Sequence, residues 1–174
     1  LGVMSVAKTL VPWFLGEEFS LSVSILMTGS LLIIAKGFTD VAGVQYLIPS
    51  RNQAIFTKSV VTGAILNVVL NFILIPICGA IGAIIASVIA EVAIAIVQYY
   101  YVKKQINIQI FTKAYLKYIV SGVLMFLTVY VMGIFMETTI ITTILQICVG
   151  GIIYIGSLLI CLLYTSPSPR DRQK

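Results

Sequence analysis

The chain has 174 residues, of which 60% are hydrophobic and only 10% are charged, and its mean hydropathy is +1.10. A soluble domain of this length has no interior large enough for so much apolar surface, because the buried fraction grows only slowly with size. The formal net charge of +5 is too small and too dispersed for a nucleic-acid-binding surface. The sequence therefore predicts an all-α protein that crosses a membrane several times.

Membrane spans are predicted where about 20 mainly apolar residues follow one another. Residues Leu1–Leu15 have the composition of the end of an earlier span, so the chain is expected to be part of a longer protein. Further segments of sufficient length follow, and none shows the period-2 alternation of membrane strands. They are Ser22–Leu47, Ser59–Pro76, Ala80–Tyr101, Ala114–Phe135 and Ile140–Ile160.

Short polar, proline and glycine segments separate these spans. Pro49 cannot continue the first full helix, and polar residues follow it. Pro76 together with the Gly79 and Gly82 pair predicts a tight turn between the second and third spans. Met136–Thr138 forms the short link before the last span. The predicted fold is therefore a polytopic transmembrane helix bundle with consecutive antiparallel helices.

Lysine and arginine lie in alternate links between the predicted spans, and the links around Pro76 and Glu137 hold none. Cationic loop residues favour the cytoplasmic side of a membrane, so the cations of the other two links are predicted to face the cytoplasm. Glu17 and Glu18 then fall outside, with Lys8 as the exception. The cytoplasmic cations are Arg51 and Lys58 after the first full span, and Lys103, Lys104, Lys113 and Lys117 after the third.

Five polar side chains inside the predicted spans are candidates for a substrate or ion pathway. A charge at mid-bilayer costs about 2.5–3.5 kcal/mol on insertion scales, so such residues normally face the bundle interior or a watery cavity. Lys36, Asn67 and Glu91 fall at about the same depth, each near the middle of a different span. The candidates are Lys36 and Asp40 in the first full span, Asn67 and Asn71 in the second, and Glu91 in the third.

Each of these candidates can also be explained by a structural role. Lys36 and Asp40 are four residues apart, so they share a helix face and are equally well explained as an intrahelical ion pair. Asn67 and Asn71 are better explained as hydrogen-bonding residues between helices than as ligands. Glu91 has no partner on its own helix and is the strongest functional candidate. The alternative is that Glu91 is an uncharged, hydrogen-bonded carboxyl with a structural role.

Small and polar residues recur every fourth position along the second and third spans. Such stripes let helices approach closely, so they predict packing surfaces and place Glu91 inside the bundle rather than against lipid. The stripes are Gly63, Asn67 and Asn71 in the second span, and Gly79, Ala83, Ser87, Glu91 and Ala95 in the third.

No pattern typical of an enzyme or of a metal or cofactor site occurs in the sequence. The chain has no histidine, and Cys78, Cys148 and Cys161 do not have the spacing of metal ligands. Phosphate-binding glycine loops and the nucleophile and metalloprotease motifs are also missing. The sequence therefore predicts a non-enzymatic membrane protein with no cofactor and no metal.

Four runs of the sequence have the character of family motifs. They are VPWFLGEEF at Val11–Phe19, GVQYLIPSRNQ at Gly43–Gln53, TGAILNVVLNFILIP at Thr62–Pro76 and GAIGAIIASVIAEVAIAIVQYYYVKK at Gly79–Lys104. These runs resemble motifs of bacterial polysaccharide and oligosaccharide flippases, members of the multidrug/oligosaccharidyl-lipid/polysaccharide exporter (MATE-like) superfamily. The resemblance covers nearly all of Leu1–Ile160, with the runs in the same order and spacing.

The resemblance implies a flippase of two six-helix lobes and two further helices, with this chain holding the end of the ninth helix and the tenth to fourteenth. Its implied partners are a polyprenyl-diphosphate-linked oligosaccharide, membrane lipid and an N-terminal lobe in the bacterial plasma membrane. Lys36 would attract the anionic diphosphate or an acidic sugar, whereas Asp40 and Glu91 would serve ion coupling or bind sugar hydroxyls. The family usually has an apolar residue at the Lys36 position and often Asn at the Asp40 position, which weighs against a family-wide role.

Two other functions fit the same sequence. A drug or cation exporter of the same superfamily would have a more apolar cavity, and Lys36 argues mildly against cationic cargo. A non-transport membrane scaffold, or a membrane-embedded transferase, is the alternative from another class, and the lack of histidine counts against the enzyme.

The last residues of the chain do not continue the pattern of membrane spans. Cys161–Asp171, CLLYTSPSPRD, is similar to the translation of a widely used sequencing adapter. We therefore expect residues 161–174 to be a non-native tail, the alternative being a basic cytoplasmic tail after the last span.

Overall fold

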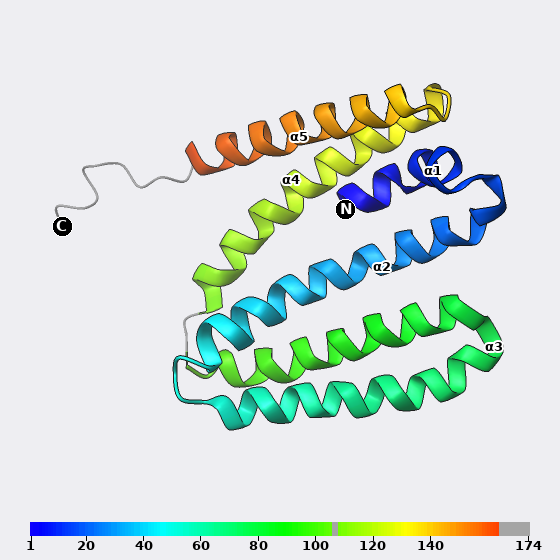
Figure 1. Ribbon diagram of the computed structural model, residues 1–174. Coiled ribbons are helices and arrows are strands. Elements are labelled where there is room, and N and C mark those ends of the chain that lie inside the picture. Colours follow the sequence, from blue (N-terminus) through cyan, green and yellow to red (C-terminus); the bar gives the residue numbers. More distant parts are fainter. Residues whose placement is uncertain (106–107, 164–174) are drawn as a thin grey trace. The chain divides into compact units, whose positions relative to one another are not determined.

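The computed structural model describes residues 1–105 and 108–163, and within them the side chains of residues 1–105 and 116–161. Every described element is helical, which confirms the all-α prediction (Figure 1). The elements are α1 (Gly2–Leu15), η1 (Glu17–Phe19), α2 (Ser20–Thr39), η2 (Asp40–Leu47), α3 (Gln53–Val102), α4 (Ile108–Phe135) and α5 (Ile140–Leu163). Of the predicted tail, residues 161–163 continue α5, and residues 164–174 lie outside the described part.

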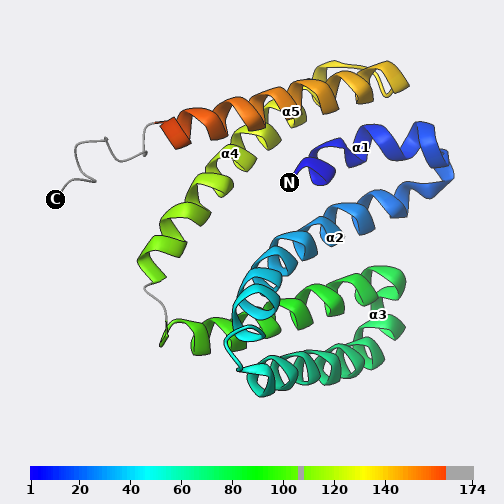
Figure 2. The same ribbon diagram turned by 60° about the vertical axis from the view of Figure 1, so that its left-hand side comes forward.

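Helix α3 is a hairpin of two antiparallel arms, as Figures 1 and 2 both show. The arms meet at Gly79, whose φ of 57° and ψ of −133° interrupt the helix. Only glycine adopts such angles readily, because it has no Cβ. The structure thus confirms the reversal between the second and third predicted spans. Pro76 lies inside the first arm, so the turn itself depends on Gly79.

Four described helices are long and apolar enough to cross a membrane: Glu17–Leu47, Gln53–Val102, Leu116–Phe135 and Ile140–Cys161. Because Gln53–Val102 reverses at Gly79, each of its arms corresponds to one predicted span. The chain is therefore a helical membrane protein, and the helices agree with the predicted segments to within a few residues at most ends. The larger differences are that α3 begins at Gln53 and α4 at Ile108, before Ser59 and Ala114.

The distribution of side chains is that of a protein surrounded by lipid. Large apolar side chains point outward, and Phe72 and Phe135 are 80% and 83% exposed. Most of the buried positions carry small or hydroxyl-bearing residues that allow close helix packing. Those residues include Ala7, Ala86, Ala90, Ser59 and Ser121.

The chain forms two compact units, which are described separately. In the unit of residues 19–108, η2 packs on the open end of the α3 hairpin around Ala42, Leu47 and Val102. The Tyr46 hydroxyl donates to Gln105 Oε1 at 3.2 Å, and Asn52 Nδ2 donates to the same atom at 3.3 Å. These bonds bring together two predicted cationic links, one with Arg51 and Lys58 and the other with Lys103 and Lys104. The charge pattern predicts that these two links lie on the same side.

The other unit consists of α1, α4 and α5, and polar side chains connect its helices. The Thr9 hydroxyl of α1 donates to Gln146 Oε1 of α5 at 2.6 Å, and Gln146 Nε2 donates to the Val129 carbonyl of α4 at 3.2 Å. Trp13 Nε1 donates to the Thr143 hydroxyl of α5 at 2.8 Å. Residues 2–15 thus form a short apolar helix with specific partners.

Replacing Gln146 by leucine is expected to destabilise this unit by about 1 kcal/mol, because the substitution removes two hydrogen bonds between helices. Unfolding in detergent micelles, followed by circular dichroism, measures the change. Ser157→Ala is the matched control, because Ser157 donates only to the Tyr154 carbonyl of its own helix. Equal shifts for both variants would show that the Gln146 bonds contribute nothing specific.

Candidate functional site

The end of α2 carries three polar side chains at the point where the helix changes its geometry. Lys36 and Thr39 lie in the last turn of α2, and Asp40 begins η2, a π-helix that runs to Leu47. A π-helical segment is rare and is often found at functional sites. Gly43 in this segment fits closely, because a Cβ there would lie 2.8 Å from the Phe56 ring and 2.9 Å from Gln98 Nε2.

Lys36 pairs with Glu91, across two helices. Lys36 Nζ lies 3.6 Å from Glu91 Oε1, and the Thr39 hydroxyl donates to the same carboxylate oxygen at 2.5 Å. The Glu91 side chain is 13% exposed and that of Lys36 55% exposed. The predicted intrahelical pair of Lys36 with Asp40 is therefore wrong. The more buried carboxylate gains more from an ammonium neighbour and a hydroxyl donor.

Asn67 connects the arms of the hairpin, as predicted, whereas Asn71 bonds to Asn67 of its own arm. Asn67 Nδ2 donates to the Ser87 hydroxyl at 3.2 Å, and Asn71 Nδ2 donates to Asn67 Oδ1 at 2.8 Å. The predicted small-residue stripes meet at this bond, because Asn67 and Ser87 are members of the two stripes. Gly63 also lies close to the second arm, where a Cβ would be 3.3 Å from the Ala90 carbonyl oxygen. Asn67 therefore joins the two arms and also lies at the wall of the site, and Asn71 supports Asn67 from the same arm.

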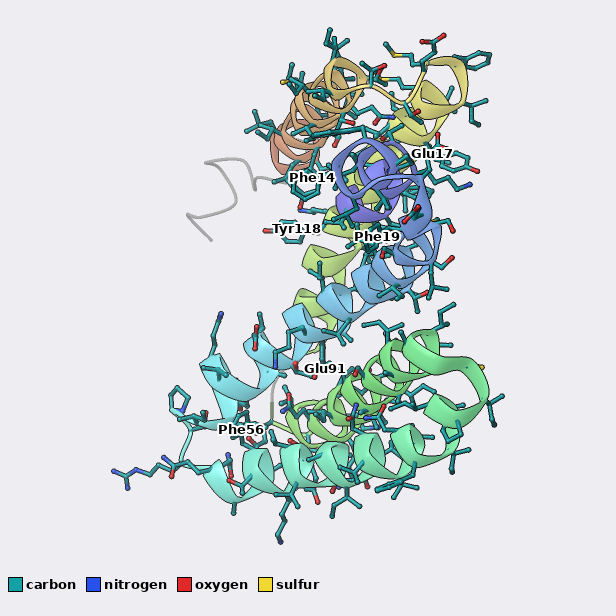
Figure 3. All side chains as sticks on the ribbon, turned by 45° about the vertical axis from the view of Figure 1, so that its right-hand side comes forward. Phe14, Glu17, Phe19, Phe56, Glu91 and Tyr118 are labelled. Carbon is teal, nitrogen blue, oxygen red and sulfur yellow. The ribbon has the colours of Figure 1, made fainter. Side chains whose placement is uncertain are left out.

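A cleft of about 360 Å³ lies between α2, η2 and the hairpin, entirely within one unit. Figure 3 shows Glu91 and Phe56 in the space between these elements. Four of the predicted candidates line the cleft, and Asn71 does not. The polar lining side chains are those of Lys36, Thr39, Asp40, Asn67, Ser87, Glu91 and Gln98.

Gln98 is a cleft residue that is not predicted from the sequence. It is 0% exposed, and its Nε2 donates to the Ser59 hydroxyl at 3.1 Å. Its Oε1 is buried and has no hydrogen-bond partner in the described part of the chain. Gln98 lies seven residues after Glu91, so the two residues share a helix face. The predicted stripe of every fourth residue does not include this position. Thr39 is also missed, although it lies between the two charged residues of α2.

The groups that line the cleft are suited to hydrogen bonding and are not clustered as a metal site in the described part of the chain. Within residues 1–105 and 116–161, no group of three or more His, Cys, Asp or Glu residues could hold a metal ion. What the arrangement offers is a polar surface between apolar helices, with an ammonium, two carboxylates and amide and hydroxyl groups. Comparison with protein-family models, with curated proteins and with solved structures finds no match for this chain.

Proposed function

We propose that this chain supplies the C-terminal helices of a bacterial flippase that moves a polyprenyl-diphosphate-linked oligosaccharide across the plasma membrane for surface polysaccharide biosynthesis. The resemblance of four ordered sequence runs to such flippases supports the family. The observation that carries the transport role is the convergence of Lys36, Asp40 and Glu91 on one cleft between membrane-spanning helices.

Helix packing alone does not account for charged side chains inside these spans. Each charge in a membrane segment costs about 2.5–3.5 kcal/mol on insertion scales, and a purely structural contact between helices can be made by Ser or Asn instead. A helix pair that needs only packing therefore gains little from Lys36 and Glu91. A carrier of polar cargo does need such groups, because the cargo must exchange its hydration for protein contacts while it crosses the apolar layer.

The direct test is Glu91→Gln in the full-length protein, expressed in a bacterium whose own repeat-unit flippase is deleted. We expect surface polysaccharide to fall at least about tenfold, the effect of losing one charge-assisted contact of about 1.4 kcal/mol or more. Immunodetection of surface polysaccharide gives the readout, and an immunoblot of the membrane fraction gives the protein level. Glu137→Gln is the control, because Glu137 is an exposed carboxylate in the link after α4.

Two results would replace this proposal by its alternatives. Export of cationic dyes, with no effect on surface polysaccharide, would indicate a drug or cation exporter. Full polysaccharide export after simultaneous neutralisation of Lys36, Asp40 and Glu91 would indicate that the cleft has no part in transport and that these helices act as a scaffold.

A further inference from the structure

Two side chains of the cleft have unpaired acceptor oxygens. Gln98 Oε1 has no partner, and the Asp40 carboxylate makes no hydrogen bond or ion pair with the described residues. Most of the neutral donors are engaged, because the Thr39 hydroxyl donates to Glu91, Asn67 Nδ2 to Ser87 and Gln98 Nε2 to Ser59. A ligand that brings O–H or N–H donors therefore complements these oxygens.

The charge of the cleft points in the same direction. Lys36 is the only cation among the described residues that line the cleft, and it lies against Glu91. Lys36 balances the charge of Glu91, so Asp40 gives the lining residues one excess negative charge. An anion such as a diphosphate would bring acceptor atoms and negative charge to a surface that already has both, which is unfavourable inside a membrane.

We infer that the cleft binds the uncharged, hydroxyl-rich sugar part of the cargo and not its diphosphate, an inference that rests on the function proposed above. Gln98 Oε1 and the Asp40 carboxylate would accept hydrogen bonds from sugar hydroxyls. The role that the sequence suggests for Lys36, attraction of the diphosphate, then passes to residues outside this cleft, and Lys36 positions Glu91.

The size and the apolar lining of the cleft fit such a ligand better than a bare cation. Its volume of about 360 Å³ lies in the range of about 300–1,000 Å³ found for small-molecule sites. Its walls extend from Ser87 to Gln98, which is about 16 Å along the second arm of α3. Phe56, Val60 and Ile94 add apolar surface on which the C–H faces of sugar rings can pack.

Saturation-transfer NMR on the full-length protein in lipid nanodiscs tests the inference, with maltotriose and methyl glycosides as neutral probes. Sodium pyrophosphate is the anionic probe, and sodium chloride alone is the cationic one. We expect a neutral sugar to bind, and Asp40→Asn and Gln98→Leu each to weaken it about tenfold, the loss expected for one hydrogen bond to an acceptor that is charged or buried. Glu17→Gln, an exposed carboxylate outside the cleft, is expected to change nothing.

Three outcomes would overturn the inference: no binding of any neutral sugar, pyrophosphate binding that Asp40→Asn strengthens or leaves unchanged, or thermal stabilisation by sodium alone that Asp40→Asn abolishes. Gln98 is fully buried, so its variant is checked for helicity by circular dichroism. Asp40 is exposed and makes no bond that folding requires, so Asp40→Asn decides the question even where Gln98→Leu fails to fold.

The outcomes also separate this inference from the function on which it rests. Polysaccharide export that depends on Glu91, without sugar binding in the cleft, would leave the flippase proposal in place and remove the sugar site. Sugar binding that Asp40→Asn weakens, in a protein that exports no polysaccharide, would retain the site and remove the flippase.

Discussion

Replacing Gly82 by alanine is expected to destabilise the α3 hairpin by about 3 kcal/mol, although Gly→Ala inside a helix normally stabilises it. A Cβ at Gly82 would lie 2.2 Å from the Leu74 carbonyl oxygen and 2.6 Å from the Leu74 carbonyl carbon. These are backbone atoms of the opposite arm, so no side-chain rotation relieves the overlap. The arms would have to separate, and the contacts on both sides of the cleft would be lost with them.

Gly37→Ala provides the matched control in the same unit, because nothing lies within 4 Å of a Cβ at Gly37. That variant is expected to be neutral or more stable by up to about 1 kcal/mol, the helix propensity difference between the residues. Unfolding of both variants in mixed micelles, followed by circular dichroism, gives the comparison. Equal stabilities would mean that the arms do not approach each other as closely as the structure indicates.

The two glycines of this hairpin show what the sequence can and cannot predict. Proline and glycine after a span correctly predict a turn, and Gly79 makes it through a backbone conformation that other residues avoid. Gly82 belongs to the same predicted turn but has another purpose, the close approach of Leu74. A close approach depends on where the opposite arm lies, and this cannot be inferred from neighbouring residues.

The site was predictable to a similar extent. Polar residues in apolar spans are costly, so Lys36, Asp40, Asn67 and Glu91 could be selected from composition alone, and all four line one cleft. The partner of Lys36 could not be predicted, because the rule that residues four apart share a helix face considers only residues of the same helix. The π-helix that begins at Asp40, the hydroxyl of Thr39 and the buried amide of Gln98 all depend on packing between helices.

A double-mutant cycle on Lys36 and Glu91 is expected to show a coupling free energy of about 3 kcal/mol, favourable to the pair. Lys36→Met leaves the Glu91 carboxylate without its ammonium neighbour, and Glu91→Gln leaves the ammonium without a carboxylate. Each single variant is expected to lose about 2–3 kcal/mol of unfolding free energy, because an uncompensated charge then remains among apolar helices. The double variant is expected to recover part of the loss, since it contains neither charge.

Lys36→Met combined with Asp40→Asn is the control cycle. Asp40 makes no ion pair with Lys36, so this pair of substitutions is expected to be additive within about 0.5 kcal/mol. A larger coupling of Lys36 to Asp40 than to Glu91 would contradict the pairing in the structure and favour the intrahelical one.

The same double variant distinguishes a structural role of the charges from a transport role. If Lys36 and Glu91 only connect α2 to α3, restored stability in the double variant should restore polysaccharide export as well. If Glu91 also takes part in carrying the cargo, export should stay at least about tenfold below that of the unsubstituted protein while stability returns. We expect the second result, because the Glu91 carboxylate lies in the wall of a cleft that also presents unpaired acceptor oxygens.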